Sequence, residues 1–280
     1  MTAKIIDGKK IADKILNELK SKIKNMKERP GLAIVLVGNN PASEIYVNFK
    51  EKTCKEVGFY CERFNLGKNI GELDLLKLIN ELNQKTNLHG ILVQLPLPKQ
   101  IDEHLIVNSI LPHKDVDGFT PLNLGSLVSE NTILAPATAR AVLHLIESTG
   151  IGIEGKNAVV VGRSNIVGKP VAMMLLEKNA TVTICHSKTK NLAEQTRKAD
   201  ILVVAVGKPR LIKKGMVKEG AVVIDVGINR ADGKIVGDVD FENVKEIAGY
   251  ITPVPGGVGP MTIAMLMQNT LKAVELAKKI

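Results

Sequence analysis

Aromatic residues are scarce in this 280-residue chain, which has no tryptophan, three tyrosines and five phenylalanines. Proteins that hold single-stranded nucleic acid stack bases on such rings, so the scarcity argues against a nucleic-acid partner despite a net charge of +9. Cysteine is rare as well. Cys54, Cys61 and Cys185 are odd in number and lack C-x-x-C spacing. This pattern predicts reduced thiols, with neither a disulfide framework nor a metal site.

Long apolar runs are also missing. None approaches the ~18 residues that a membrane span needs, so we expect no membrane association. The first residues, MTAKIIDGKKIADKI, lack the apolar core of a secretory signal and instead begin a pattern of helical spacing at Ile11, Ile15, Leu19 and Ile23. We therefore expect a cytoplasmic protein. Its many lysines suit small anionic ligands, because summed positive charge speeds their capture.

Apolar strands alternate with amphipathic helices along almost the whole chain, which predicts an α/β fold with parallel sheets covered by helices. In the first half the expected strands cover 32–38, 59–66 and 90–98. The second half repeats the rhythm with more Val and Ile, in strands expected over 157–162, 181–187, 201–207 and 221–227. Unbroken apolar runs of this kind indicate strands that are buried on both faces.

A change in composition marks the expected boundary between two domains. The segment 111–136 is rich in Pro, Gly, Asn and Asp and shows little periodicity. The first domain is therefore expected to cover 1–137. A helix from about 138 to 149 leads into the second domain, which is expected to cover 138–261 and to be followed by a last helix over 262–280.

Gly162 and Gly168 bracket the loop GRSNIVGKP, and Pro170 falls in the first turn of the next expected helix. A strand, a glycine-rich turn and a helix place backbone N–H groups and the positive end of the helix dipole against a phosphate. The spacing G-x-S-x-x-x-G differs from the usual G-x-G-x-x-G, and a tight turn without a ligand has the same local pattern. The surrounding run of buried strands favours a dinucleotide site.

The end of the following strand distinguishes NAD from NADP. An acid there bonds the ribose hydroxyls, whereas a cation or a hydroxyl accommodates the extra phosphate. Here the strand end reads CHSKTK over 185–190, without Asp or Glu between Glu177 and Glu194. Together with Arg163, this predicts NADP. His186 has no second ligand at usable spacing, so we interpret it as a strand-end residue and not as a metal ligand.

Two segments near the C-terminus combine glycine with acidic or apolar residues. In DVGINRADGKIVGDVDF, Asp232-Gly233 predicts a hairpin turn. The carboxylates of this segment lack calcium-loop spacing, so we interpret them as structural; they are Asp225, Asp238 and Asp240. In PVPGGVGPMT, the glycines Gly256, Gly257 and Gly259 precede a helix for which Thr262 is the expected cap. So much glycine predicts close backbone approach, either to a cofactor or within a strained interdomain turn.

Tyr46 and Lys50 are four residues apart, which places both on one face of a helix. For an arbitrary Y-x-x-x-K pair the ordinary outcome is a half-buried ring and an exposed lysine. The alternative is a catalytic pair, as in short-chain dehydrogenases. Chain order excludes that family, because its glycine-rich loop precedes its tyrosine, whereas here the tyrosine comes first.

Several long segments, in order, resemble the bifunctional methylenetetrahydrofolate dehydrogenase/cyclohydrolase family, and the resemblance covers nearly the whole chain. They are NPASEIYVNFK, GILVQLPLP, KDVDGF, GRSNIVGKP, DVGIN, GDVDF and PVPGGVGPMT. The resemblance implies a folate-binding first domain, a Rossmann-like NADP-binding domain, a cleft between them and a homodimer. It also implies that the helix over 262–280 returns to the first domain.

Carried over position by position, the resemblance implies a set of site residues. Lys50 is the central catalytic residue, Tyr46 lies along the folate and orients it, and Gln94 bonds the lysine. Asp117 holds the pterin, with Ser43 as a neighbour. On the cofactor side the match points to Arg163, Ser164, Ser187, Gly257 and Thr262.

The implied chemistry has two steps, and tetrahydrofolate carries the reacting carbon in both. Oxidation of the methylene bridge removes hydride and depends on how the nicotinamide is positioned. Hydrolysis of the resulting methenyl cation to the formyl compound needs a group that takes and returns a proton. A lysine with its ordinary pKa of about 10.4 is almost always protonated at neutral pH. Desolvation lowers that pKa, and Gln94 directs Lys50 without adding a counter-charge.

The chain departs from the family where the interdomain helix begins. The family usually carries P-C-T-P-x-G, whereas this chain reads PATARA over 136–141. Because alanine is a strong helix former, we expect the helix to persist, with the balance of the two activities left open. One alternative is a chain that has kept the dehydrogenase alone. Another is a non-catalytic dinucleotide-binding interaction protein, against which Lys50, Gln94 and Asp117 argue.

Overall fold

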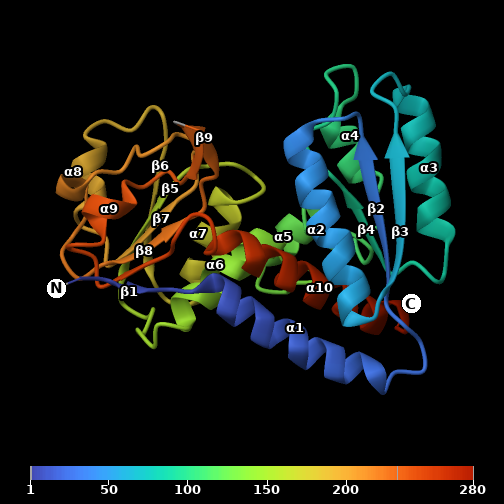
Figure 1. Ribbon diagram of the computed structural model, residues 1–280, viewed down its shortest axis with the longest axis horizontal. Helices are drawn as coiled ribbons and strands as arrows, with labels where there is room; N and C mark the ends of the chain where they lie inside the picture. The colour runs from blue at the N-terminus through green and yellow to red at the C-terminus, as the bar shows by residue number, and fades with distance from the viewer. Residues whose placement is uncertain (1, 232, 280) are drawn as a thin grey trace. The chain divides into compact units, whose positions relative to one another are not determined.

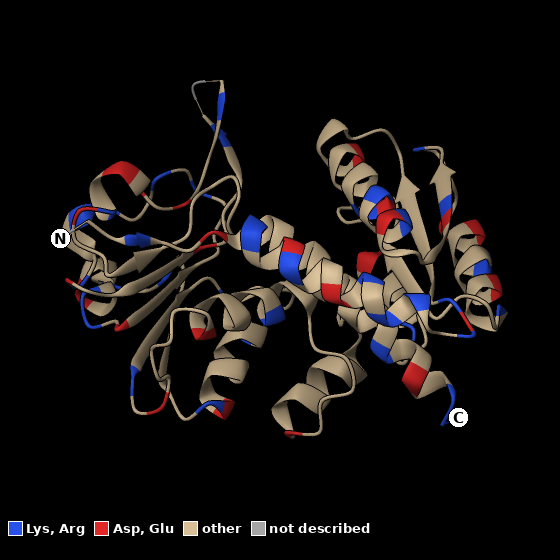
Figure 2. Ribbon diagram, turned by 60° about the horizontal axis from the view of Figure 1, so that its bottom comes forward, with Lys and Arg blue, Asp and Glu red and all other residues tan. Residues whose placement is uncertain are grey.

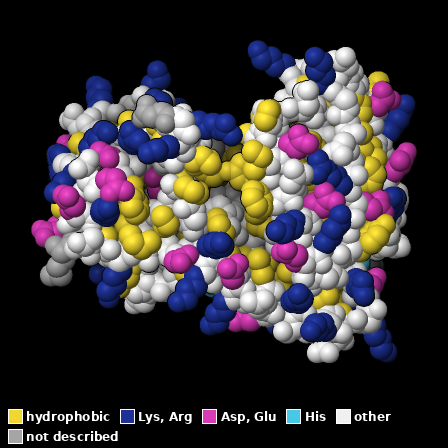
Figure 3. Space-filling model, viewed as in Figure 1, with side chains coloured by type: hydrophobic (Ala, Val, Ile, Leu, Met, Phe, Trp, Pro, Cys, Tyr) yellow, Lys and Arg dark blue, Asp and Glu magenta, His cyan; other side chains and the backbone are white. Residues whose placement is uncertain are grey.

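The computed structural model describes residues 2–231 and 233–279, which form two compact units (Figure 1). Unit 1 comprises Met1–Asp13 and Thr138–Met265, and unit 2 comprises Lys14–Ala137 and Leu266–Ile280. Helices α1 (Gly8–Lys24) and α10 (Val258–Ala277) each contribute residues to both units. Figure 2 shows Lys and Arg mixed with Asp and Glu along the helices, and Figure 3 shows the same mixing on one face.

Unit 1 is built on a six-stranded parallel sheet of order β1-β11-β8-β7-β5-β6. In that order the strands are Lys4–Ile5, Tyr250–Ile251, Val222–Asp225, Ile201–Val204, Asn157–Val161 and Thr181–Cys185. Side chains of β5, β7 and β8 pack in one apolar core with residues of the segments that connect the strands, which explains the dense Val and Ile runs. Because β5 lies between β6 and β7, the strand order reverses there. In such sheets ligands bind outside the carboxyl ends of the strands at this switch point.

The helices of unit 1 connect these strands. They are α6 (Ala137–Glu147), α7 (Gly168–Glu177), α8 (Leu192–Thr196), the 3-10 turn η1 (Lys214–Met216) and α9 (Phe241–Val244). Helix α7 packs against β5 and β6, which presents its N-terminus at the carboxyl end of β5. The predicted hairpin is formed by β9 (Asn229–Ala231) and β10 (Lys234–Val236), which pair antiparallel. Asp232 of its turn lies outside the described residues.

Unit 2 contains a three-stranded parallel sheet of order β3-β2-β4 (Tyr60–Leu66, Gly31–Val37 and Gly90–Val93). Alternate residues of β2 pack in one apolar cluster with α3 (Glu72–Gln84). Helix α2 (Pro41–Val57) contacts β2 and β3 and lies across the sheet from α3 (Figure 1). Two short helices follow, α4 (Glu103–Asn108) and α5 (Pro121–Val128).

The predicted α/β fold with parallel sheets is confirmed, and the differences have local causes. The strand expected over 90–98 ends at Val93, because Pro96 and Pro98 have no N–H to donate to a ladder. Helix α5 was missed in the segment expected to be irregular. Thr120 caps it by accepting from the backbone N–H of Asn123, and Pro121 occupies its first turn.

The expected cap at Thr262 is wrong. Helix α10 begins at Val258, so Thr262 lies one turn inside it and donates its hydroxyl to the Val258 carbonyl at 3.1 Å. Pro260 is tolerated in the first turn, where a missing N–H costs no helical bond. Glycines before a helix can therefore belong to its first turn as well as to the loop that precedes it.

The first residues also group differently from the expectation that 1–137 form one domain. Strand β1 pairs with β11 in register Lys4 to Tyr250, and Met1–Asp13 cluster with unit 1. A two-residue strand followed at once by helix α1 leaves too short a pattern for a prediction from sequence. Within the described residues, no helix is both long enough and apolar enough to cross a membrane.

Candidate active site

Helix α2 carries three of the predicted site residues on one face. The side chain of Asn40 caps it by accepting from the backbone N–H groups of Ala42 and Ser43, at 2.9 and 3.2 Å. Ser43, Tyr46 and Lys50 then follow at spacings of three and four residues, which brings them onto the same side of the helix. Ser43 and Lys50 are buried and Tyr46 is partly buried.

The ammonium group of Lys50 is held by Gln94. Lys50 is 9% exposed, and its Nζ donates to Oε1 of Gln94 at 3.0 Å. Gln94 directly follows β4, where its backbone N–H donates to the Val35 carbonyl at 2.9 Å. Its side-chain Nε2 donates to the carbonyl of Leu95 at 2.8 Å. Both ends of the amide are therefore engaged, with its oxygen bonded to the lysine.

Asp117 supplies the opposite charge. Burial lowers the pKa of Lys50, and the negative charge of Asp117 acts in the other direction and raises it. For Asp117, burial raises the pKa, the charge of Lys50 lowers it and the charge of Asp115 raises it. The charge of each group thus changes the pKa of the other, and both groups belong to unit 2. Burial also raises the pKa of Tyr46, so the phenol stays protonated at neutral pH.

Asp115, which sequence reasoning did not single out, shapes the loop that carries Asp117. It is 1% exposed, and its carboxylate accepts from the backbone N–H groups of Gly118 and Thr120, at 2.9 and 2.7 Å. It also accepts from Nδ2 of Asn123 at 2.8 Å. The signal in the sequence was the D-x-D spacing of KDVDGF, in which the first acid organises the turn and the second interacts electrostatically with Lys50.

We expect Asp115→Ala to lower the free energy of unfolding by about 3 kcal/mol, because it leaves several buried donors without a partner. Chemical denaturation monitored by circular dichroism measures this loss. Asp74→Ala, on the exposed face of α3 in the same unit, is the matched control and should change stability by less than about 0.5 kcal/mol. Equal stability of the two variants would show that Asp115 does not hold the loop.

The segment 136–141, which departs from the family motif, contacts the loop that carries Asp117 through backbone atoms. The N–H of Ala137 donates to the carbonyl of Asp117 at 3.3 Å, and a Cβ atom at Gly118 would lie 2.6 Å from the nitrogen of Pro136. Ala137 itself is buried, and helix α6 begins there, as expected for an alanine-rich start. The contact needs no particular side chain at 137, so the alanine leaves it intact.

The glycine-rich loop after β5 is a closed turn. A Cβ atom at Gly168 would collide with the carbonyl oxygen of Gly162, and one at Gly162 would collide with the carbonyl oxygen of Ala205. Gly162 also has a φ of +133°, which disfavours other residues. Ser164 accepts from the N–H groups of Val167 and Gly168 at 3.2 and 3.3 Å, so its hydroxyl stabilises the turn.

The predicted cofactor residues fall into two groups. Gly162, Arg163 and Ser164 follow β5, and Ser187 follows the neighbouring strand β6; Arg163, Ser164 and Ser187 are exposed. Gly257, in contrast, follows β11, which β7 and β8 separate from β5. His186 accepts from the N–H of Lys188 at 3.1 Å through Nδ1, as a strand-end residue would.

Gly257 has a packing reason of its own. A Cβ atom at Gly8, the first residue of α1, would collide with the Gly257 carbonyl, and one at Gly257 would lie 2.6 Å from the Pro253 carbonyl. The backbone N–H of Lys9 donates to the carbonyl of Gly256 at 2.9 Å. Of the two explanations left open by the sequence, close packing of the chain is therefore sufficient for this glycine.

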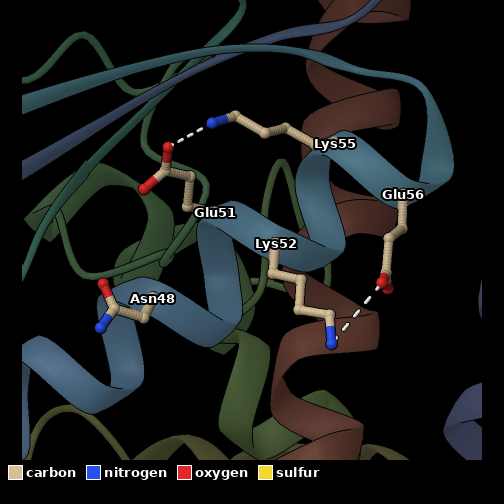
Figure 4. Close-up of a pocket in the computed structure, with 5 residues that line it drawn as sticks. All are labelled: Asn48, Glu51, Lys52, Lys55 and Glu56. Atoms are coloured by element: carbon tan, nitrogen blue, oxygen red, sulfur yellow. Dashed lines mark hydrogen bonds and ion pairs between the residues drawn. The ribbon is translucent and has the colours of Figure 1, made fainter.

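A shallow hollow on the outer face of α2 does not belong to the site. Its lining residues are Asn48, Glu51, Lys52, Lys55 and Glu56 (Figure 4). The charged residues pair with each other along the helix, Lys52 with Glu56 and Lys55 with Glu51. The charges of the lining residues are therefore paired at the surface. Lys50 is not among the residues that line the hollow. Among the described residues, no cluster of three or more His, Cys, Asp or Glu is arranged to hold a metal ion.

Comparison with known proteins bears on both units. The family model of the tetrahydrofolate dehydrogenase/cyclohydrolase catalytic domain matches residues 6–117, and that of the corresponding NAD(P)-binding domain matches residues 136–278. A curated relative from Halothermothrix orenii, the bifunctional protein FolD, is 58% identical over 275 residues. That match spans 96% of this chain and 97% of the relative.

Solved structures agree. The bifunctional FolD methylenetetrahydrofolate dehydrogenase/cyclohydrolase of Campylobacter jejuni matches with a TM-score of 0.95 at 51% identity, over 98% of this chain and 99% of that one. The Trypanosoma brucei enzyme, solved with NADP cofactor and an inhibitor, matches with a TM-score of 0.95 at 38% identity over 100% of both chains. This chain therefore belongs to the tetrahydrofolate dehydrogenase/cyclohydrolase family.

Proposed function

We propose that this protein oxidises methylenetetrahydrofolate to methenyltetrahydrofolate with NADP and then hydrolyses the product to formyltetrahydrofolate. Family membership and full-length similarity to bifunctional relatives support both activities. The observation that carries the proposal is a buried lysine, Lys50, whose Nζ donates to the neutral amide oxygen of Gln94 at 3.0 Å and whose pKa is lowered by burial and raised by the charge of Asp117.

The folate site is proposed to lie in unit 2 around these side chains. Asp117, an acceptor carried on a loop that Asp115 fixes, suits the paired N–H donors of a pterin ring. Tyr46 offers a partly buried ring one helical turn before Lys50, against which the substrate can stack. Ser43 lies a further turn along the same face and completes this wall of the site.

The residues at the carboxyl ends of β5 and β6 fit NADP. The backbone packs closely at Gly162 and Gly168, and this tight turn leads directly into α7, whose N-terminal N–H groups suit a phosphate. Arg163 and Ser187 are exposed there, and the end of β6 carries no acid that would repel a 2′-phosphate. NADP, when bound, accepts the hydride that the methylene carbon loses.

Lys50 serves the hydrolytic step. With its pKa lowered by burial, the amine can accept a proton from the attacking water and return it when the ring opens. Gln94 fixes the direction of Nζ and, being neutral, does not stabilise the charged ammonium as a carboxylate would.

An absorbance assay tests the proposal. Purified protein given methylenetetrahydrofolate and NADP should produce NADPH, and methenyltetrahydrofolate given alone should be hydrolysed. If NADPH is produced but methenyltetrahydrofolate is not hydrolysed, the protein is a dehydrogenase without cyclohydrolase activity. Absence of both activities in a folded protein would contradict the assignment.

We also propose a homodimer in the cytoplasm that takes no part in nucleic-acid or membrane binding. The family resemblance supports the dimer, and the three free cysteines suit a reducing compartment. The mixture of basic and acidic side chains along the helices is unlike the continuous basic stripe of a nucleic-acid surface (Figure 2). Light scattering coupled to gel filtration tests the dimer, and a monomeric mass would contradict it.

We expect Ser187→Asp to raise the KM for NADP about tenfold or more, because the new carboxylate repels a 2′-phosphate. The preference of the enzyme for NADP over NAD should decrease as a result. Steady-state kinetics with both cofactors measures the change. Thr181→Asp places the same charge on an exposed residue at the other end of β6 and is the matched control. Unchanged cofactor preference in Ser187→Asp would place the 2′-phosphate elsewhere.

A further inference from the structure

Two buried carboxylates lie in unit 1 outside the proposed catalytic group. Asp225 ends β8 and is 3% exposed, and Asp238 precedes α9 and is 0% exposed. The sequence led us to interpret both as structural. A buried carboxylate is costly unless hydrogen bonds compensate it, so the donors that surround each one show which backbone segments it holds.

Asp238 accepts four hydrogen bonds, two at each oxygen. Its Oδ2 accepts from the backbone N–H groups of Val206 and Gly207 at 2.7 and 3.0 Å. Its Oδ1 accepts from the backbone N–H of Lys208 at 2.7 Å and from Nδ2 of Asn229 at 2.9 Å. Three successive N–H groups of one loop thus point at a single carboxylate, which fills its acceptor positions.

Asp225 holds Asp238 in place. Its carboxylate accepts from the backbone N–H groups of Gly227, Asp238 and Val239, at 3.0, 2.9 and 2.8 Å. Glycine is required beside each acid, because a Cβ atom at Gly227 would collide with the Asp238 carboxylate and one at Gly237 with the Asp225 carboxylate. Burial raises the pKa of Asp225 to about 7, against the effect of these N–H groups.

The loop that Asp238 holds follows β7, at the switch point of the sheet. Its first residue, Ala205, lies against Gly162, whose Cβ position its carbonyl oxygen occupies. Gly207 has a φ of +64°, which favours glycine, and open space around its Cβ position, so a ligand can approach its backbone. Gly207 and Lys208 are exposed, and a lysine in such a place suits phosphate.

We propose that Asp238 is a positioning residue that holds residues 206–208 as the second wall of the dinucleotide phosphate site, opposite the turn of Gly162 to Gly168. The proposal rests on the proposed NADP-dependent function and adds a residue to it that does not touch the cofactor. Asp238 acts through the backbone of the β7 loop, and Asp225 fixes Asp238 in turn.

The test replaces the carboxylate by an amide of the same shape. In Asp238→Asn an NH2 group takes the place of one carboxylate oxygen and cannot accept from N–H donors. At least one backbone hydrogen bond that holds residues 206–208 is therefore lost. We expect the dissociation constant of NADP, measured by isothermal titration calorimetry, to rise about tenfold or more. Folate affinity, which belongs to unit 2, should change less than about twofold, and the KM for NADP should rise while kcat at saturating NADP is largely kept.

Asp200→Asn is the matched control. Asp200 also joins two segments of the same sheet, accepting from the N–H of Asn157 at 2.9 Å, but it does so at the amino ends of the strands. A merely structural carboxylate should lower thermal stability without changing NADP affinity, as we expect for Asp200→Asn. If Asp238→Asn behaves in the same way, the proposal is overturned.

A second variant covers the case in which Asp238→Asn fails to fold. Asn229→Ala removes one donor and keeps the carboxylate, so NADP affinity should fall by a smaller factor of about 3, and unchanged affinity in this variant would also overturn the proposal. Titration of the wild-type protein with NADP distinguishes a failure of the proposed function from a failure of the role of Asp238. Wild-type protein that binds no NADP contradicts the proposed function itself, whereas normal wild-type binding with unaffected variants contradicts the role of Asp238 alone.

Discussion

Replacement of Lys50 by glutamine should abolish ring opening, with a loss of about 1,000-fold, and should reduce dehydrogenation by less than about tenfold. Proton transfer by a placed side chain contributes roughly 10²- to 10⁴-fold, and an amide cannot accept a proton at neutral pH. Hydride transfer depends on the positions of the reactants, which glutamine preserves by its similar length and its ability to bond Gln94. Separate assays of the two reactions measure the split.

Lys52→Gln provides the control for this experiment. Lys52 lies two residues along the same helix with a side chain that is 70% exposed, so both activities should stay within about twofold of wild type. Full hydrolysis by Lys50→Gln would remove Lys50 from the chemistry. Equal loss of both reactions would instead indicate a misplaced substrate, because dehydrogenation does not need a proton acceptor.

Asp117→Ala should weaken folate binding about 10- to 100-fold and leave NADP affinity within about twofold. A carboxylate that accepts from paired N–H groups is worth roughly 1.5–3 kcal/mol, which corresponds to this range. Calorimetric titration of each ligand measures the two affinities. Equal loss of both would point to a folding defect. Asp74→Ala, exposed in the same unit, should leave both affinities unchanged.

The Asp117 variant has a second expected effect, on the pH dependence of ring opening. The charge of Asp117 raises the pKa of Lys50, so its removal should lower that pKa further. A neutral lysine is the form that accepts a proton, and its fraction grows as pH rises through the pKa. The rate profile of Asp117→Ala at saturating folate should therefore reach its plateau at lower pH than the wild-type profile.

Much of the fold could be predicted from the sequence because it rests on local signals. The Val and Ile runs of β5, β7 and β8 could only be buried parallel strands, and the loop between Gly162 and Gly168 required a strand before it and a helix after it. The strand β1 was not predictable, because two residues carry no pattern. The start of α10 was misplaced, since glycines there suggested a loop.

The candidate site was predicted in part through resemblance and in part through residue type. Spacing put Tyr46 and Lys50 on one helix face, but it could not show that Gln94, 44 residues away, bonds Lys50. The roles of Asp115 and Asp238 were hidden for a related reason. Each carboxylate accepts from backbone N–H groups, which every residue has, so no side-chain pattern in the sequence reveals the partners.

The pKa of Lys50 is the quantity on which the account depends most. It can be measured by NMR titration of protein labelled at the lysine side-chain carbons, with Lys50→Gln used to assign the signal. We predict a pKa below the ordinary value of about 10.4 that coincides with the midpoint of a ring-opening rate that rises with pH. A pKa at or above that value, or a rate profile that Lys50→Gln leaves unchanged, would contradict the account.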